Sequence, residues 1–126
     1  MIKGIGVDVV EIRRMGEVVE KWGDGFLNKI FTEGELSYAR SKKFPINHFA
    51  GRFAAKEAVS KALATGWSGG FRWKDVEVSN DEAGKPSVIL HGAAREQLAG
   101  GRVLISISHS ETMVVATAVI EAKGYA

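Results

Sequence analysis

The sequence predicts an α+β fold in one compact domain over residues 1–126, with an antiparallel sheet and one long helix. Two segments at the ends of the chain, Ile2 to Val10 and Met113 to Ile120, are rich in the β-branched residues that strands favour. Val103 to His109 alternates as a strand does, and Asn47 to Ala64 is dense in alanine, as a helix is. Strands at both ends with helices between them suggest an α+β arrangement.

Two further helices are expected in the first half of the chain. From Glu11 to Lys21, apolar residues recur at spacings near 3.6, which predicts an amphipathic helix that Gly23-Asp24-Gly25 breaks. Thr32 with Glu35 three residues later predicts a capping box. The capping box opens a short helix that runs to about Arg40.

The second half is expected to add a hairpin, a short helix and the two closing strands. Lys74 to Ser79 and Pro86 to Leu90 are strands joined by a turn at 80–85. Gly92 to Leu98 is a short helix, and Ser110-Glu111-Thr112 joins the last two strands. Three glycines are expected to stop the long helix before the hairpin: Gly66, Gly69 and Gly70.

The composition favours a cytoplasmic protein with no membrane partner. Hydrophobic residues make up 45% and charged residues 25%, which is typical of a globular domain. No apolar run approaches the ~20 residues that span a bilayer, and the first residues lack the features of a signal peptide. The absence of cysteine excludes disulfides, thiolate metal sites and a cysteine nucleophile.

The charge is distributed unevenly, although the net charge is only +2. Between Lys29 and Lys61 there are seven basic residues and three acidic ones. A basic surface there predicts a negatively charged partner: nucleic acid, a phosphorylated cofactor or an acidic protein.

Three residue types are out of place for a purely structural role. Asp8 lies inside an apolar strand, where a carboxylate needs a partner, so it either caps the next helix or binds a metal. Glu57 and Lys61 are four residues apart on the long helix. One alternative is a solvated ion pair that stabilises the helix by ~0.2–0.5 kcal/mol. The other is a functional site, because the small residues around the pair would let a ligand come close.

His109 follows the alternating strand among hydroxyl side chains. It is either a hydrogen-bonded structural residue or, together with those hydroxyls, a donor to an oxyanion. His48 and His91 have no such setting. The sequence contains no dinucleotide fingerprint, no Walker A loop and no GxSxG elbow.

Three segments, in this order, resemble the bacterial holo-acyl-carrier-protein synthase family of 4′-phosphopantetheinyl transferases. They are Gly4 to Arg14, Phe49 to Ala62, and Ile105 to Ser110 with Gly84-Lys85-Pro86 before it. The similarity extends from Met1 to about Glu121, and the second segment, with AAKEAVSKA, is the most specific.

The resemblance implies a 4′-phosphopantetheinyl transferase fold, a homotrimer with active sites between subunits, and a role in fatty acid and lipid biosynthesis. The reaction it implies moves phosphopantetheine from coenzyme A to a serine of an apo acyl carrier protein and releases adenosine 3′,5′-bisphosphate. The implied roles follow by position. Magnesium is bound by Asp8 and Glu57; catalysis is by Glu57 and Lys61; coenzyme A is bound by Arg52, Lys61, Lys85, Ser108 and His109; the carrier is met by Arg13 and Arg14.

These residue types suit phosphoryl transfer, which depends mainly on charge and alignment. Magnesium prefers one or two carboxylates plus phosphate oxygens and water, and Asp8 and Glu57 supply that number. Lys61, one helical turn from Glu57, can neutralise charge on the leaving oxygen. The serine proton can pass to a metal-bound water or to Glu57, and both alternatives stay open.

Two competing functions are weaker. A non-enzymatic nucleic-acid-binding module would use Arg40, Lys42, Lys43 and Arg52 on phosphates, with Phe44, Phe49 and Trp67 stacking on bases. It leaves Asp8 and Glu57 unexplained, so no nucleic-acid partner is expected. A magnesium-dependent phosphohydrolase would need more carboxylates for a two-metal site.

Overall fold

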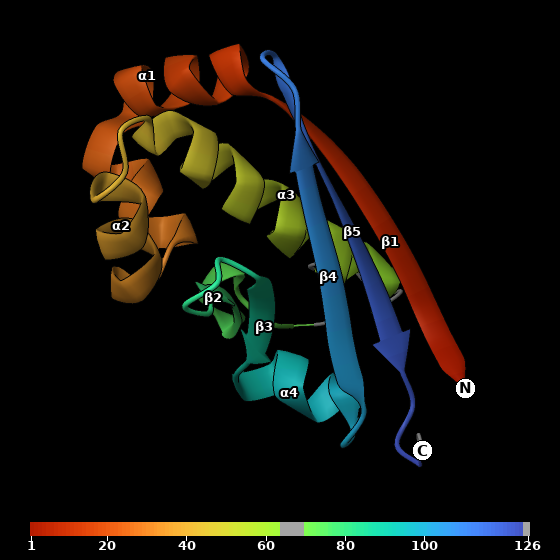
Figure 1. The fold of residues 1–126 in the computed structure, drawn as a ribbon. Helices are drawn as coiled ribbons and strands as arrows, with labels where there is room; N and C mark the ends of the chain where they lie inside the picture. The colour runs from red at the N-terminus through yellow and green to blue at the C-terminus, as the bar shows by residue number, and fades with distance from the viewer. Residues whose placement is uncertain (64–69, 125–126) are drawn as a thin grey trace.

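The computed structural model describes residues 1–63 and 70–124, and within them it confirms the predicted α+β fold (Figure 1). A three-stranded antiparallel sheet packs against a long central helix, and the remaining elements lie around that helix. The elements are β1 (Ile2–Glu11), α1 (Ile12–Ile30), α2 (Glu33–Arg40), α3 (Pro45–Ala62), η2 (Trp73–Asp75), β2 (Val76–Asn80), β3 (Pro86–Leu90), α4 (Gly92–Leu98), β4 (Arg102–His109) and β5 (Met113–Glu121).

The strands form two sheets rather than the single sheet that was expected. The larger sheet has the order β1-β5-β4, and the hairpin β2-β3 forms a separate two-stranded sheet. In the larger sheet Asp8 lies opposite Ala116, which in turn lies opposite Ile107. Because side chains alternate along a strand, these three residues share the face that covers α3.

The strand β1 lies unusually close to α3, and two glycines make that approach possible. A Cβ atom added at Gly6 would lie 1.9 Å from the carbonyl oxygen of Ala58, and one added at Gly4 would lie 1.9 Å from that of Ala62. Only glycine fits at both positions, and the alanines of α3 leave the same space on the helix side. This contact brings Asp8 up to the helix that carries Glu57 and Lys61.

The first helix departs from its prediction at one point. Gly23, with φ of 56° and ψ of −141°, kinks the chain where the break was expected, but the helix then resumes and ends at Ile30. It resumes because Leu27 and Ile30 are buried in the core. The predicted capping box of α2 is confirmed: the Thr32 hydroxyl accepts from the Glu35 N–H at 3.2 Å, and the Glu35 carboxylate accepts from the Thr32 N–H at 2.9 Å.

The hairpin begins later than its sequence pattern predicts. The hairpin strand predicted from Lys74 begins at Val76, since Trp73–Asp75 forms a 3₁₀ turn closed by the Asp75 N–H on the carbonyl of Arg72. The predicted stop of the long helix at Gly66 and Gly69 lies outside the described residues.

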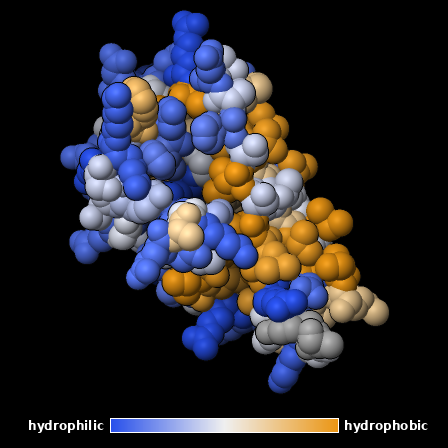
Figure 2. Space-filling view, viewed as in Figure 1, coloured by the Kyte–Doolittle hydropathy of each residue, from blue (hydrophilic) through white to orange (hydrophobic). Residues whose placement is uncertain are grey.

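The outer face of the larger sheet is apolar and exposed. The inner face of this sheet is buried. On the outer face, Ile5, Val7 and Val9 of β1 are 71%, 51% and 52% exposed, and Leu104 of β4 is 48% exposed. Figure 2 shows hydrophobic residues gathered along the side of the molecule where this sheet lies. None of the helices in the described residues is both long and apolar enough to cross a membrane.

Candidate active site

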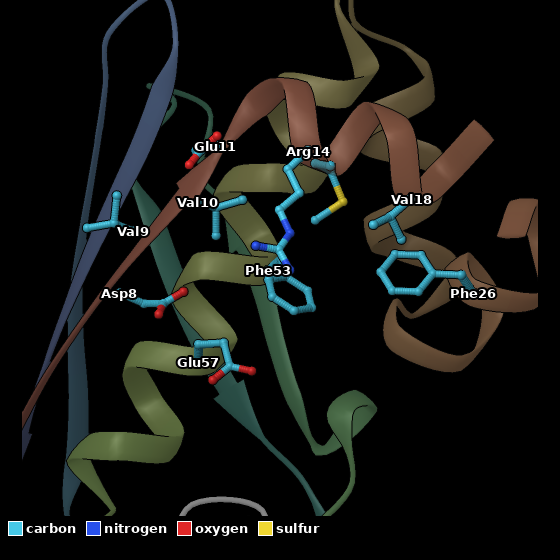
Figure 3. Close-up of a pocket in the computed structure, with 10 residues that line it drawn as sticks. Asp8, Val9, Val10, Glu11, Arg14, Val18, Phe26, Phe53 and Glu57 are labelled. Carbon is cyan, nitrogen blue, oxygen red and sulfur yellow. The ribbon is translucent and has the colours of Figure 1, made fainter. Parts of the chain in front are cut away.

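A cavity of about 380 Å³, here called the first cavity, lies where β1 continues directly into α1 and both meet α3 (Figure 3). Charged and apolar side chains both line it. Its lining consists of Asp8, Val9, Val10, Glu11, Arg14, Met15, Val18, Phe26, Phe53 and Glu57.

Asp8 is paired with a lysine and does not cap the following helix. Its side chain is 18% exposed, and its Oδ1 atom lies 3.1 Å from Nζ of Lys61. The same ammonium donates to the carbonyl of Val7 at 3.0 Å. The N-cap of α1 is Glu11, three residues further on. The capping alternative for Asp8 is therefore wrong.

Glu57 faces the same cavity from α3, so two carboxylates that are 49 positions apart in the sequence meet at one place (Figure 3). In the described part of the chain, no group of three or more His, Cys, Asp or Glu side chains could hold a metal ion. The protein thus offers two hard oxygen ligands and no complete cage. That donor set fits Mg²⁺, which takes its other ligands from phosphates and water.

The two neighbouring arginines of α1 have different surroundings. Arg14 lines the first cavity and extends towards Phe53 (Figure 3). Arg13 has a side chain that is 91% exposed, and its Nε atom pairs with Glu17 at 3.2 Å on the helix surface.

A second cavity, of about 390 Å³, lies between α3, the β2–β3 hairpin and the end of β4. Its central cation is Arg52, which is only 4% exposed. Nη2 of Arg52 donates to Oδ1 of Asn80 at 2.7 Å, and the guanidinium lies 4.1 Å from the ring centre of Tyr38. Among the described residues, Nε of Arg52 is the one buried side-chain nitrogen or oxygen without a hydrogen-bond partner.

Two histidines add to the chemistry of the second cavity. His109 lies there as expected, and His48 lies there as well, one helical turn before Arg52. Burial lowers the pKa of His48, and the nearby charges of Arg52, Lys42 and His109 lower it further. The second cavity therefore has the character of an anion-binding site.

The sequence missed three residues of this second cavity: Tyr38, His48 and Asn80. The only signal for His48 was its spacing of four residues from Arg52 on a predicted helix. Tyr38 and Asn80 come from elements distant in sequence, and only the folded chain brings them to Arg52.

Three of the predicted coenzyme-binding residues, Lys61, Lys85 and Ser108, lie outside the lining of the second cavity, and Lys61 pairs instead with Asp8. Lys85 is exposed in the hairpin turn, between Gly84 and Pro86, which do line it. Ser108 is exposed one residue before His109, and strand alternation directs it to the outer face of the sheet. Ser108 and His109 therefore do not act on the same side of the sheet.

The two cavities open on different sides of α3. Arg52 and Glu57 are five residues apart, which on an α-helix separates them by about 140° around the axis. One chain therefore presents a carboxylate site and a cationic site in different directions.

The basic segment that suggested nucleic acid is not a continuous basic surface. Lys56 is 0% exposed, and Arg52 is 4% exposed and faces the second cavity, so the two do not extend a basic surface along which a nucleic-acid strand could lie. Phe49 is buried in the core, and Trp67 lies outside the described residues. This arrangement argues against the nucleic-acid-binding alternative.

Comparison with known proteins gives the family. The 4′-phosphopantetheinyl transferase superfamily matches residues 4–117. The holo-[acyl-carrier-protein] synthase of Protochlamydia amoebophila is 48% identical over 119 residues, covering 94% of this chain and 98% of that protein. The crystal structure of the synthase from Neisseria meningitidis is 36% identical with a TM-score of 0.88, covering 96% and 99% of the two chains. The Bacillus anthracis synthase, solved in complex with CoA (3′,5′-ADP), is 39% identical with a TM-score of 0.83, covering 98% and 99%. Taken with the carboxylates of the first cavity and the cations of the second, these matches show that the chain belongs to the holo-[acyl-carrier-protein] synthases of the 4′-phosphopantetheinyl transferase superfamily.

Proposed function

We propose that this chain transfers the 4′-phosphopantetheine group of coenzyme A to a serine hydroxyl of an apo acyl carrier protein, in a magnesium-dependent reaction at Asp8, Glu57 and Lys61. Membership of the synthase family supports the reaction. The observation that carries the assignment of residues is the meeting of the Asp8 and Glu57 carboxylates at one cavity, with the Lys61 ammonium 3.1 Å from Asp8.

Asp8 and Glu57 are the residues that would bind Mg²⁺. Both provide hard oxygen atoms, and Asp8 is held rigidly because the close contact at Gly6 fixes β1 against α3. When bound, the metal ion supplies positive charge beside the phosphates and activates the oxygens it binds.

The chain's own residues account for the rest of the step. The serine oxygen forms a bond to the β-phosphorus, and the bond from that phosphorus to the bridging oxygen breaks, which releases adenosine 3′,5′-bisphosphate. Glu57 faces the cavity and can accept the serine proton. Lys61 carries a charge that can move from Asp8 to the phosphate oxygens as negative charge develops on the leaving group.

The second cavity is the proposed site of the adenosine 3′,5′-bisphosphate part of coenzyme A. It contains Arg52 with an unpaired Nε donor, His48 and His109, and these groups suit a multiply charged anion. The exposed positions of Lys85 and Ser108 allow them to contact coenzyme A only from the rim of the hairpin and from the outer face of the sheet.

A homotrimer would bring the two kinds of cavity together. The exposed apolar outer face of the larger sheet supports self-association, because contiguous apolar surfaces usually mark interfaces. The different directions of the two cavities support a site that takes the first cavity from one subunit and the second cavity from its neighbour.

Arg13 and Arg14 are the proposed contacts for the acidic carrier. Arg14 lies at the first cavity, where the serine must arrive, and Arg13 is exposed beside it on α1. Positive charge there would steer an acidic protein towards the carboxylates and the phosphates.

Intact mass spectrometry tests the proposed reaction. Purified protein, coenzyme A, Mg²⁺ and an apo acyl carrier protein should yield a carrier that is heavier by one phosphopantetheine group, and a serine-to-alanine carrier should stay unmodified. A carrier that stays unmodified with its serine intact would contradict the proposal.

A further inference from the structure

An ion pair lies buried at the meeting point of α2, α3 and β2, away from the reacting groups. Lys56 is 0% exposed and Glu35 is 1% exposed. Nζ of Lys56 lies 2.8 Å from Oε1 of Glu35 and also donates to the carbonyls of Trp73 and Val76. These three acceptors use all three protons of the ammonium group.

Both carboxylate oxygens of Glu35 also have hydrogen-bond partners. Its Oε1 accepts from the Thr32 N–H at 2.9 Å, and its Oε2 accepts from the Val78 N–H at 2.9 Å. Through Lys56 and Glu35, α2 and α3 are thus joined to the backbone of β2 at Val76 and Val78. We call this set of contacts the inner cross-link.

The same three elements are joined a second time at the second cavity. Arg52, one turn before Lys56 on α3, donates to Asn80, two residues after Val78 on β2, at 2.7 Å. Its guanidinium lies 4.1 Å from the ring centre of Tyr38, three residues after Glu35 on α2. We call these contacts the outer cross-link. It joins the same three elements as the inner cross-link, at residues two to four positions away on each element.

The two cross-links differ in one respect. Every polar group of Lys56 and Glu35 has a partner, whereas Nε of Arg52 is buried without one among the described residues. The inner cross-link is therefore complete, and the outer one retains a donor for a ligand. A donor held in place before the ligand arrives costs less ordering on binding.

We propose that Lys56 and Glu35 are positioning residues for the anion site of the second cavity: the buried pair fixes β2 and α2 against α3, so that Arg52, Asn80 and Tyr38 are already arranged for the phosphates of coenzyme A. The inference rests on the proposed function for the identity of the anion. Burial lowers the pKa of Lys56 and Glu35 opposes that change, so removing either partner alone leaves an uncompensated group.

The experiment compares binding of adenosine 3′,5′-bisphosphate by calorimetry to the wild type, Lys56→Met, and Lys56→Met with Glu35→Gln. The double variant removes both charges and keeps one amide oxygen as the acceptor for one of the two backbone N–H groups, so it is expected to fold even if the single variant does not. Ile120→Ala is the control, because Ile120 is a buried core residue on β5 outside the lining of the second cavity. All measurements are made below the unfolding temperature of each variant, where circular dichroism shows a folded protein.

The double variant should bind the bisphosphate about 10-fold or more weakly than the wild type, because small displacements of binding groups have effects of that size. The KM for coenzyme A should rise while the KM for the carrier stays unchanged. The control should bind as the wild type does, although it too loses stability.

A folded double variant with wild-type affinity would overturn the inference and leave the proposed function standing. A wild type that does not bind the bisphosphate would overturn the assignment of the second cavity itself, and the inference with it.

Discussion

The two cavities beside α3 are built in different ways. Asp8 of β1 lines the first cavity, and Lys61 of α3, which is 52% exposed and lies beside that lining, pairs with Asp8 across a strand-to-helix contact that only glycine permits. The cation of the second cavity is Arg52, which is only 4% exposed. Its position depends on contacts with α2 and β2 as well as on its own helix, α3. The proposed reacting groups thus come from two elements in close contact, whereas the proposed anion site depends on three elements fixed against one another.

The largest effect is expected from removing one carboxylate of the first cavity. Asp8→Asn changes the charge and hardly the shape, so kcat should fall by about 10²–10³-fold while the melting temperature changes little. Activity of the wild type should be lost with chelator and return with Mg²⁺ or Mn²⁺. Glu11→Gln, at another carboxylate in the same lining, is the control and should keep most of the activity. Full activity in a metal-free preparation would contradict both assignments.

Lys61→Ala should lower kcat by about 10²-fold and leave the KM for the carrier close to the wild-type value. The reason is that its proposed contact with the phosphates is stronger in the transition state than in the ground state. Steady-state kinetics with each substrate varied separately measures the two effects. A wild-type kcat would show that Lys61 is only a partner of Asp8.

Arg14→Ala should act on the carrier instead. We expect the KM for the carrier to rise about 10-fold, and its dependence on salt to become weaker, because one steering charge is lost. Arg13→Ala removes the same charge from an exposed residue already paired with Glu17, so its effect should be smaller. Equal effects of the two variants would argue against a specific place for Arg14 at the first cavity.

The smallest effect concerns the pKa of His48 in the second cavity. The pKa of His48 is lowered by burial and by the neighbouring cations, so the neutral ring is favoured in the free protein. Phosphates placed beside it favour the imidazolium form, and adenosine 3′,5′-bisphosphate should therefore raise the pKa of His48. An NMR titration of the ring protons measures this. His91, beside Glu77 at 3.0 Å and outside both cavities, should not respond.

The sequence predicted the fold and the first cavity well, and the second cavity less well. Asp8 and Glu57 could be found because a carboxylate in an apolar strand and a charged pair among alanines contradict their local patterns. Tyr38 and Asn80 contradict nothing in their own segments, and only tertiary contacts with Arg52 give them a role. The continuation of α1 past Gly23 was missed for a similar reason, since core burial of Leu27 and Ile30 outweighs the glycine.

The central claim is that one active site combines the first cavity of one subunit with the second cavity of its neighbour. Subunit complementation tests it most directly: Asp8→Asn and Arg52→Ala chains, each with little activity alone, are refolded together and assayed, with native mass spectrometry to confirm that mixed trimers form. If the site is shared, about one quarter of all sites in a random 1:1 mixture of the two chains combine two intact halves, and activity should return to that level. Activity no higher than that of the separate variants, in a confirmed mixed trimer, would contradict the shared site.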